Sequence, residues 1–177
     1  MGSFAAVSAP RVHVAPSREW AELAVRAGGG DIAPACHGLD GVIWCGDEPR
    51  QLELLLENTG ASWVQLTSTG VDAYLHLIDD NRLWTCARGA FAEPVAELAL
   101  GMMLALRRRL VSYARRDRWS DREGQTLHRA SVTVIGGGGI ARSLLRLLGP
   151  FNCATAVVNT SGNAVDGADH TYRASEL

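Results

Sequence analysis

The chain has 177 residues, of which 47% are hydrophobic and 20% are charged. This composition is typical of a folded globular protein and excludes a disordered, fibrous or polytopic membrane protein. The formal net charge is −2, from 17 basic and 19 acidic residues, so no overall field favours nucleic acid or an anionic membrane as a partner. Every basic residue is arginine, which excludes a lysine nucleophile or Schiff base.

The cysteines and the apolar stretches favour a cytoplasmic protein. No two cysteines form a C-x-x-C pair, which speaks against a metal site and a disulfide scaffold; they are Cys36, Cys45, Cys86 and Cys153. The first ten residues lack the pattern of a signal peptide. The longest apolar stretch, residues 95–106, is shorter than the roughly 20 residues of a membrane span. We therefore expect no bound metal and no membrane or nucleic-acid partner.

Strands alternate with helices through the first half of the chain. The expected strands are residues 11–15, 41–45, 62–66 and 82–85, and the expected helices are residues 18–27 and 49–60. Ser17 and Asp47 are the expected N-caps of these two helices. This alternation predicts an α/β fold with a doubly wound parallel sheet.

The second half begins with the longest predicted helix, residues 91–114, in which apolar side chains recur at helical spacing. We expect its methionines, Met102 and Met103, to lie in the core. After a polar segment the strand–helix pattern resumes; it comprises a strand at residues 131–135, a glycine turn at 136–139, a helix at 140–148 and a strand at 154–158.

The glycine turn satisfies the pattern G-x-G-x-x-[G/A] through Gly136, Gly138 and Ala141. The first glycine permits a tight turn, the second lets the backbone approach a diphosphate, and the small third residue lets the helix pack on the strand. The N–H groups around Gly139 and Ile140 would then face the diphosphate at the helix N-terminus. The context of strand, turn, helix and strand favours binding of NAD or NADP over a glycine-rich turn without a ligand.

The end of the second strand leaves the choice of cofactor open. An acidic residue that binds the ribose 2′-hydroxyl is expected there, about 20 positions after the glycines. Asn159 occupies that position and is followed by Thr160 and Ser161. These neutral side chains would not repel a 2′-phosphate, but no arginine adjoins them in the sequence to bind one. NADP is therefore easier to accommodate here than in a site that carries the usual acidic residue.

Three motifs occur in the order found in a known family. Residues 67–72, 89–98 and 131–161 together resemble the D-isomer-specific 2-hydroxyacid dehydrogenases. The resemblance implies a flavodoxin-like substrate lobe at residues 1–90, a linking helix and connector at 91–130, and the N-terminal part of a Rossmann NAD(P)-binding lobe at 131–177.

The resemblance also implies an oxidoreductase activity. It implies reversible hydride transfer between NAD or NADP and a small 2-oxo or 2-hydroxy acid of the glyoxylate or hydroxypyruvate type. The backbone N–H groups of Thr69 and Gly70 would bind the substrate carboxylate, and such a turn is a plausible anion nest on physical grounds. Asp72 is expected to cap the helix that follows rather than to act in catalysis.

No catalytic residue is assigned. The family's chemistry requires an arginine in an N-x-[A/S]-R-G stretch, a glutamate, and a histidine in a T-P-H-like stretch, and no segment of the 177 residues matches the arginine or histidine stretch. We therefore expect the front part of a longer protein, without turnover on its own. Two alternatives remain. One is a non-catalytic or regulatory pseudo-enzyme that dimerises through the 91–114 helix and the cofactor lobe, with itself or with an intact relative. The other is a generic nucleotide-binding domain.

Overall fold

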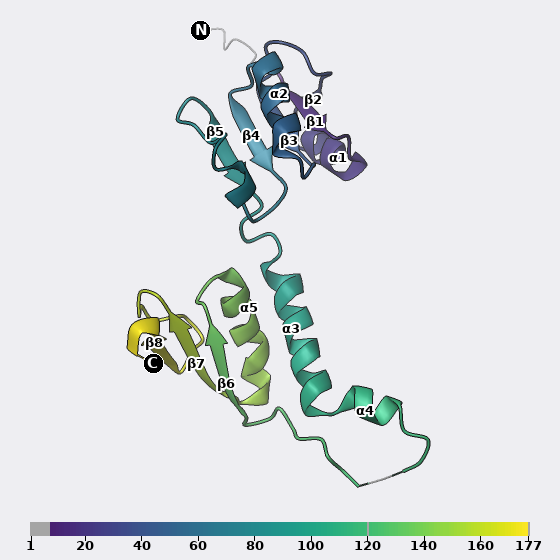
Figure 1. Ribbon diagram of the computed structural model, residues 1–177, viewed down its shortest axis with the longest axis vertical. Coiled ribbons are helices and arrows are strands. Elements are labelled where there is room, and N and C mark those ends of the chain that lie inside the picture. Colours follow the sequence, from purple (N-terminus) through teal and green to yellow (C-terminus); the bar gives the residue numbers. More distant parts are fainter. Residues whose placement is uncertain (1–7, 120, 177) are drawn as a thin grey trace, which may run out of the picture. The chain divides into compact units, whose positions relative to one another are not determined.

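The computed structural model describes residues 8–119 and 121–176 and divides into two compact units, one extending to Arg88 and one beginning at Gly89. Each unit is built around its own parallel β-sheet (Figure 1). The predicted α/β class is thus confirmed. No helix in the described ranges is both long and apolar enough to cross a lipid bilayer.

The first unit contains a five-stranded sheet in the order β2-β1-β3-β4-β5, with every pair parallel. Its elements are β1 (Arg11–Ala15), α1 (Glu19–Ala27), β2 (Asp31–Ile32), β3 (Gly41–Trp44), α2 (Pro49–Thr59), β4 (Trp63–Leu66), the short 3₁₀ helix η1 (Asp72–Tyr74) and β5 (Leu83–Cys86). The two-residue strand β2 was not predicted, because it is too short to show a periodic pattern.

Both faces of this sheet are covered by helices, which explains the continuous apolar run of β3. Val42 belongs to the same core cluster as Leu52 of α2, whereas its neighbour Ile43 packs with Val25 of α1. Because successive side chains of a strand point to opposite faces, α1 and α2 lie on opposite sides of the sheet. A strand covered on both faces needs apolar side chains at every position.

The two predicted N-caps are wrong by one position each. Helix α1 begins after Arg18, which makes no side-chain capping bond, while the Ser17 hydroxyl donates to the Glu22 carboxylate at 2.6 Å. Helix α2 is capped by the carboxylate of Glu48 instead of Asp47. In both cases the residue after the predicted cap is the last one with extended backbone before the helix, which is the defining property of an N-cap.

The second unit contains a three-stranded parallel sheet in the order β6-β7-β8. Its elements are α3 (Ala92–Arg107), α4 (Leu110–Ala114), β6 (Ser131–Ile135), α5 (Gly139–Leu148), the 3₁₀ helix η2 (Gly149–Phe151), β7 (Ala154–Asn159), β8 (His170–Arg173) and the 3₁₀ turn η3 (Ala174–Glu176). A core cluster that includes Ala96 of α3 and Leu144 and Leu148 of α5 joins these two helices.

The predicted single helix over residues 91–114 is wrong, because the helix is interrupted at Arg109. This residue is in the left-handed region, with φ of 53°, and separates α3 from α4. The N–H of Gln125 donates to the Arg107 carbonyl at 2.7 Å, and the Arg107 Nε donates to the Thr126 carbonyl at 2.9 Å. The connector therefore donates a hydrogen bond to the Arg107 carbonyl, which in a continuous helix would accept one from the next turn.

The prediction for the two methionines is half right. Met103 packs against the core cluster between α3 and α5, but Met102 is 53% exposed. Helical spacing identifies an apolar face without saying whether the protein covers that face.

Strand β8 lies in a segment where no strand was predicted. Its residues are exposed or half-buried and show no apolar alternation, so its sequence resembles a loop. Asp169, just before β8, holds it to β7: one carboxylate oxygen accepts hydrogen bonds from the N–H and the hydroxyl of Thr155, at 2.7 and 2.9 Å. These two bonds, the backbone one first, lower the pKa of Asp169.

Candidate functional site

The glycine turn connects β6 to α5 in the second unit. Gly136 has a backbone φ of 98°, a conformation that residues other than glycine rarely adopt. Its N–H donates to the Val158 carbonyl at 2.7 Å, which ties the start of the turn to β7. Gly138 is the N-cap of α5, and a Cβ atom added to it would meet nothing within 4 Å. The turn thus leaves open space beside Gly138.

The N-terminus of α5 faces this open space with unpaired donors. The first helical bond runs from the Arg142 N–H to the Gly138 carbonyl at 3.1 Å. Within residues 8–119 and 121–176 no group accepts a hydrogen bond from the N–H of Gly139 or Ile140. Ala141 is buried and lets the helix pack closely. A diphosphate binds favourably to free N–H groups at the positive end of a helix, and the open space beside Gly138 gives it room.

The glycine between the two fingerprint glycines has a separate steric role. A Cβ atom on Gly137 would lie 2.7 Å from Val165 Cγ2 and 3.3 Å from Asn159 Nδ2. The loop after β7 therefore packs directly against the glycine turn, and only glycine fits between them without displacement.

Asn159 shapes that loop with its own side chain. Its Oδ1 accepts hydrogen bonds from the Gly162 N–H at 2.6 Å and from the Ser161 hydroxyl at 3.2 Å, and its Nδ2 donates to the Asn163 carbonyl at 2.9 Å. Thr160 is exposed on the same turn. The predicted cofactor-contacting segment 159–161 is thus a compact turn whose Asn159 amide is engaged within the loop.

An arginine lies beside this turn, contrary to the expectation drawn from the sequence neighbours. The Arg173 guanidinium donates to the Ser161 carbonyl from Nη2 at 2.9 Å and from Nε at 3.3 Å. Arg173 is the last residue of β8 and is the register partner of Asn159 on β7. The sequence does not reveal this neighbour, because the parallel pairing of β7 with β8 leaves no local pattern.

The second predicted binding turn follows β4 in the first unit. The Ala87 N–H donates to the Ser68 carbonyl at 3.1 Å and the Ser68 hydroxyl donates to the Gly70 carbonyl at 2.9 Å, so the turn is well ordered by its own bonds. Among the described residues, none accepts a hydrogen bond from the N–H of Thr69 or Gly70. This arrangement is able to bind a small anion.

The expected capping role of Asp72 is wrong. Asp72 lies inside the 3₁₀ helix η1, whose N-cap is Val71, and no side-chain capping bond forms there. The element that follows the turn is a three-residue 3₁₀ helix, so the α-helical N-cap geometry that would use an aspartate does not arise.

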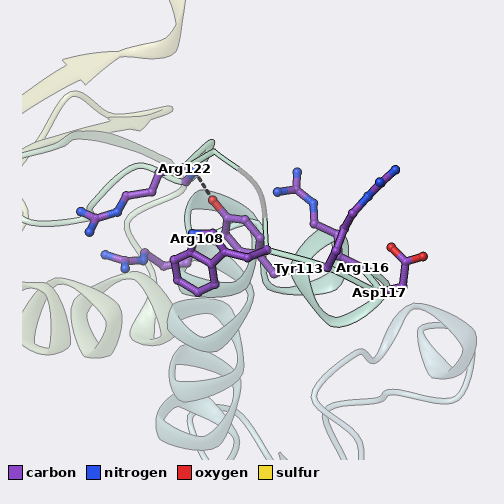
Figure 2. A pocket seen from close by; sticks show the side chains of 8 residues that line it. Arg108, Tyr113, Arg116, Asp117 and Arg122 are labelled. Carbon is purple, nitrogen blue, oxygen red and sulfur yellow. Dashed lines mark hydrogen bonds between the residues drawn. The ribbon is translucent and has the colours of Figure 1, made fainter.

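Helix α4 and the connector after it line a cavity of about 560 Å³, which no motif in the sequence indicates (Figure 2). Its lining includes Arg108, Tyr113, Arg116, Trp119 and Arg122. The N–H groups of Glu123 and Gly124 donate to the Tyr113 hydroxyl at 2.6 and 3.2 Å and lower the pKa of that phenol. Arg116 lies 4.7 Å from the ring centroid and pairs with Glu123 at 2.5 Å. These contacts order the connector, and no residue of the glycine turn lines the cavity.

Among the residues that the structure describes, no group of three or more His, Cys, Asp or Glu side chains is placed to bind a metal ion. The four cysteines are free thiols. Burial raises the pKa of Cys45, which makes its thiol less reactive.

A strand–glycine turn–helix unit on a parallel sheet is the arrangement found in dinucleotide-binding α/β proteins. Residues 100–177 match the NAD-binding domain of the D-isomer specific 2-hydroxyacid dehydrogenases. This match assigns residues 100–177 to the D-isomer specific 2-hydroxyacid dehydrogenase family.

The similar proteins include one curated relative and several solved structures. An uncharacterized protein encoded in the proB 3′ region of Corynebacterium melassecola is 31% identical over 156 residues, which cover 84% of this chain and 50% of that protein. A D-isomer specific 2-hydroxyacid dehydrogenase family protein from Aeromonas salmonicida has a TM-score of 0.79 at 22% identity, covering 97% of this chain and 60% of that one.

An NADPH-dependent glyoxylate/hydroxypyruvate reductase from Sinorhizobium meliloti, solved with NADP and sulfate, has a TM-score of 0.73 at 19% identity. The match covers 94% of this chain and 57% of that one. The present chain therefore spans half to three-fifths of the length of these similar proteins.

Proposed function

We propose that this chain binds NAD or NADP at the glycine turn and takes part in reversible hydride transfer between that cofactor and a small 2-oxo or 2-hydroxy acid. The observation that carries the proposal is the open space at Gly138, faced by the free N–H groups of Gly139 and Ile140. The NADPH-dependent action of the Sinorhizobium meliloti neighbour on glyoxylate and hydroxypyruvate supports the same assignment.

The two units have different proposed roles. The strand order of the first unit, 2-1-3-4-5, is that of flavodoxin-like sheets, which supports a substrate-binding lobe. In that lobe the N–H groups of Thr69 and Gly70 would bind the substrate carboxylate. The second unit, with its three parallel strands, would be the N-terminal part of a Rossmann lobe.

In this proposal the chain's own residues bind the cofactor and orient it. The backbone N–H groups of Gly139 and Ile140 would bind the diphosphate, Gly136 and Gly138 would admit it, and Ala141 would keep α5 close to the sheet. When bound, the nicotinamide cofactor supplies or accepts the hydride. No residue between 1 and 177 is assigned to proton transfer, so we expect cofactor binding but no turnover with glyoxylate, pyruvate or hydroxypyruvate from this chain.

Calorimetric titration of the 177-residue chain with NADPH and NADH tests the nucleotide site directly. We expect saturable binding of at least one cofactor, and a Gly138→Ala variant that folds normally but binds it more weakly, because its Cβ occupies the space required by the diphosphate. If neither cofactor binds to the folded wild-type chain, the proposal is wrong.

A second titration separates this function from a generic nucleotide-binding domain. Glyoxylate or hydroxypyruvate is added to the chain already saturated with cofactor, and the cofactor affinity is measured again. A change in that affinity supports a 2-oxo acid site, because linked binding changes both affinities by the same factor. An unchanged affinity favours the generic nucleotide-binding alternative.

A further inference from the structure

We propose that Arg173 and the turn at residues 159–162 form a binding site for the 2′-phosphate of NADP, so that this chain selects NADP over NAD. The inference rests on the proposed function, because it requires a dinucleotide in the glycine turn. It assigns a specificity role to a residue of β8 that lies far from the glycine fingerprint in the sequence.

The end of β7 is the position that distinguishes the two cofactors. In parallel dinucleotide-binding sheets the residue at the end of the second strand lies beside the adenosine ribose, where a carboxylate accepts hydrogen bonds from the 2′-hydroxyl of NAD. Here that residue is Asn159, whose Oδ1 already accepts two hydrogen bonds from within its own loop. The turn thus lacks the free carboxylate that favours NAD.

The Arg173 guanidinium is held in place at this position. Its Nε and Nη2 both donate to the Ser161 carbonyl, at 3.3 and 2.9 Å. Gly162, with φ of 71°, lets the side chain lie across the turn: a Cβ atom at Gly162 would be 3.2 Å from Arg173 Cβ and 3.4 Å from Nε. A guanidinium has five N–H donors, so three remain for an anion after these two bonds.

The charges around Arg173 leave its guanidinium available. The nearby carboxylate of Glu176 accepts a hydrogen bond from the backbone N–H of Arg173 at 3.2 Å, and no ion pair joins it to the guanidinium among the described residues. The Asp169 carboxylate is occupied by Thr155. A phosphate monoester carries a charge of about −1.5 to −2 near neutral pH. An arginine with free donors is therefore a suitable partner for it.

The hydroxyl of Thr160 completes the polar surface of the turn. Thr160 is exposed beside Ser161, whose carbonyl holds the guanidinium. A neutral hydroxyl neither repels a phosphate nor replaces the carboxylate that NAD would need. The same turn therefore favours a 2′-phosphate through Arg173 and offers little to an unmodified ribose.

Four ligands test the inference on the intact 177-residue chain: NADPH, NADH, and the fragments 2′,5′-ADP and 5′-AMP, which lack the nicotinamide. Calorimetry should show that NADPH binds at least about tenfold more tightly than NADH and that 2′,5′-ADP binds more tightly than 5′-AMP, since a charge-assisted hydrogen bond pair is worth about that factor. Arg173→Ala should remove both preferences while leaving NADH affinity unchanged.

Three further variants serve as controls. Arg146→Ala removes an exposed arginine of α5 that pairs with Glu93, so it should keep both preferences. Gly162→Ala retains the charge but displaces the guanidinium, so it should reduce the preference for the 2′-phosphate. Arg173→Lys keeps a point charge without the guanidinium geometry and should retain part of the preference.

The possible failures are distinguishable. Equal affinities for NADPH and NADH, or an Arg173→Ala variant that weakens both cofactors equally, would overturn the inference while the proposed function stands. Tighter binding of NADH than of NADPH would do the same. If the folded chain binds none of the four ligands, both the proposed function and the inference are wrong.

Discussion

Two adjacent glycines of the turn illustrate how different physical reasons act at the scale of single residues. Gly138 borders open space, whereas a side chain on Gly137 would meet the stiff, buried side chain of Val165. The fingerprint pattern names Gly138 and treats Gly137 as a free position. In this chain, however, Gly137 is sterically the more restricted of the two.

Alanine at each position should therefore have a different effect. We expect Gly137→Ala to lower the free energy of unfolding by about 1–3 kcal/mol, the usual cost of inserting a methyl group into a packed site. Gly138→Ala should cost less than about 1 kcal/mol, since it only weakens a helix cap. Urea denaturation of both variants measures the difference.

A double variant provides the control for the contact itself. Shortening Val165 removes the atom that the new Cβ would meet, so Val165→Ala should cost less stability in the Gly137→Ala background than in the wild type. Strictly additive costs would show that the two residues do not interact.

At the scale of an element, the attachment of β8 to β7 depends on Asp169. Its carboxylate accepts two hydrogen bonds from Thr155, which is buried, and these bonds lower the pKa of Asp169. A carboxyl group whose pKa is lower in the folded state stabilises the fold above its ordinary pKa. That contribution is lost as the pH falls toward the lowered value.

We therefore expect Asp169→Asn to destabilise the chain at pH 6 and to differ less and less from the wild type below about pH 4, the ordinary pKa of aspartate. Urea denaturation across this pH range measures the difference. Asp166→Asn changes an exposed aspartate four residues from β8 and should match the wild type throughout. A cost of Asp169→Asn that is independent of pH would contradict the assignment.

At the scale of the whole molecule, α3 presents apolar side chains to solvent. Leu98, Met102 and Leu106 are 61%, 53% and 77% exposed, and they recur at helical spacing. Exposed apolar surface of this kind marks an association site. We propose that a second copy of this chain covers it, as in the alternative in which the 91–114 segment mediates dimerisation.

The oligomeric state tests this proposal. Light scattering after gel filtration should give twice the 18.9 kDa of one chain, and Leu98→Glu should give the monomer, because a charge on the apolar face is not tolerated in a buried interface. Leu54→Glu, on α2 of the first unit, alters another exposed leucine and should leave the dimer intact. A wild-type chain that stays monomeric at high concentration would contradict the proposal.

Local patterns were sufficient for much of the fold and for the glycine turn. The β-branched run at residues 131–135, the glycines after it and the apolar periodicity of α5 all follow from interactions within a few residues. Strand β3 was equally predictable, because a strand covered on both faces has an uninterrupted apolar sequence. The caps at Ser17 and Asp47 failed by one position, since the last residue with extended backbone before each helix, Arg18 or Glu48, lies one residue further on.

The sequence by itself determined the parallel α/β class, the position of the glycine turn and the family resemblance, because all three depend on the spacing of residues along the chain. Only the tertiary structure decided that Arg173 lies beside Ser161, that Gly137 has no room for a side chain and that Met102 faces solvent. Each of these depends on which segments pack together. Strand pairing and helix packing join residues that are distant in sequence, so no local pattern contains them.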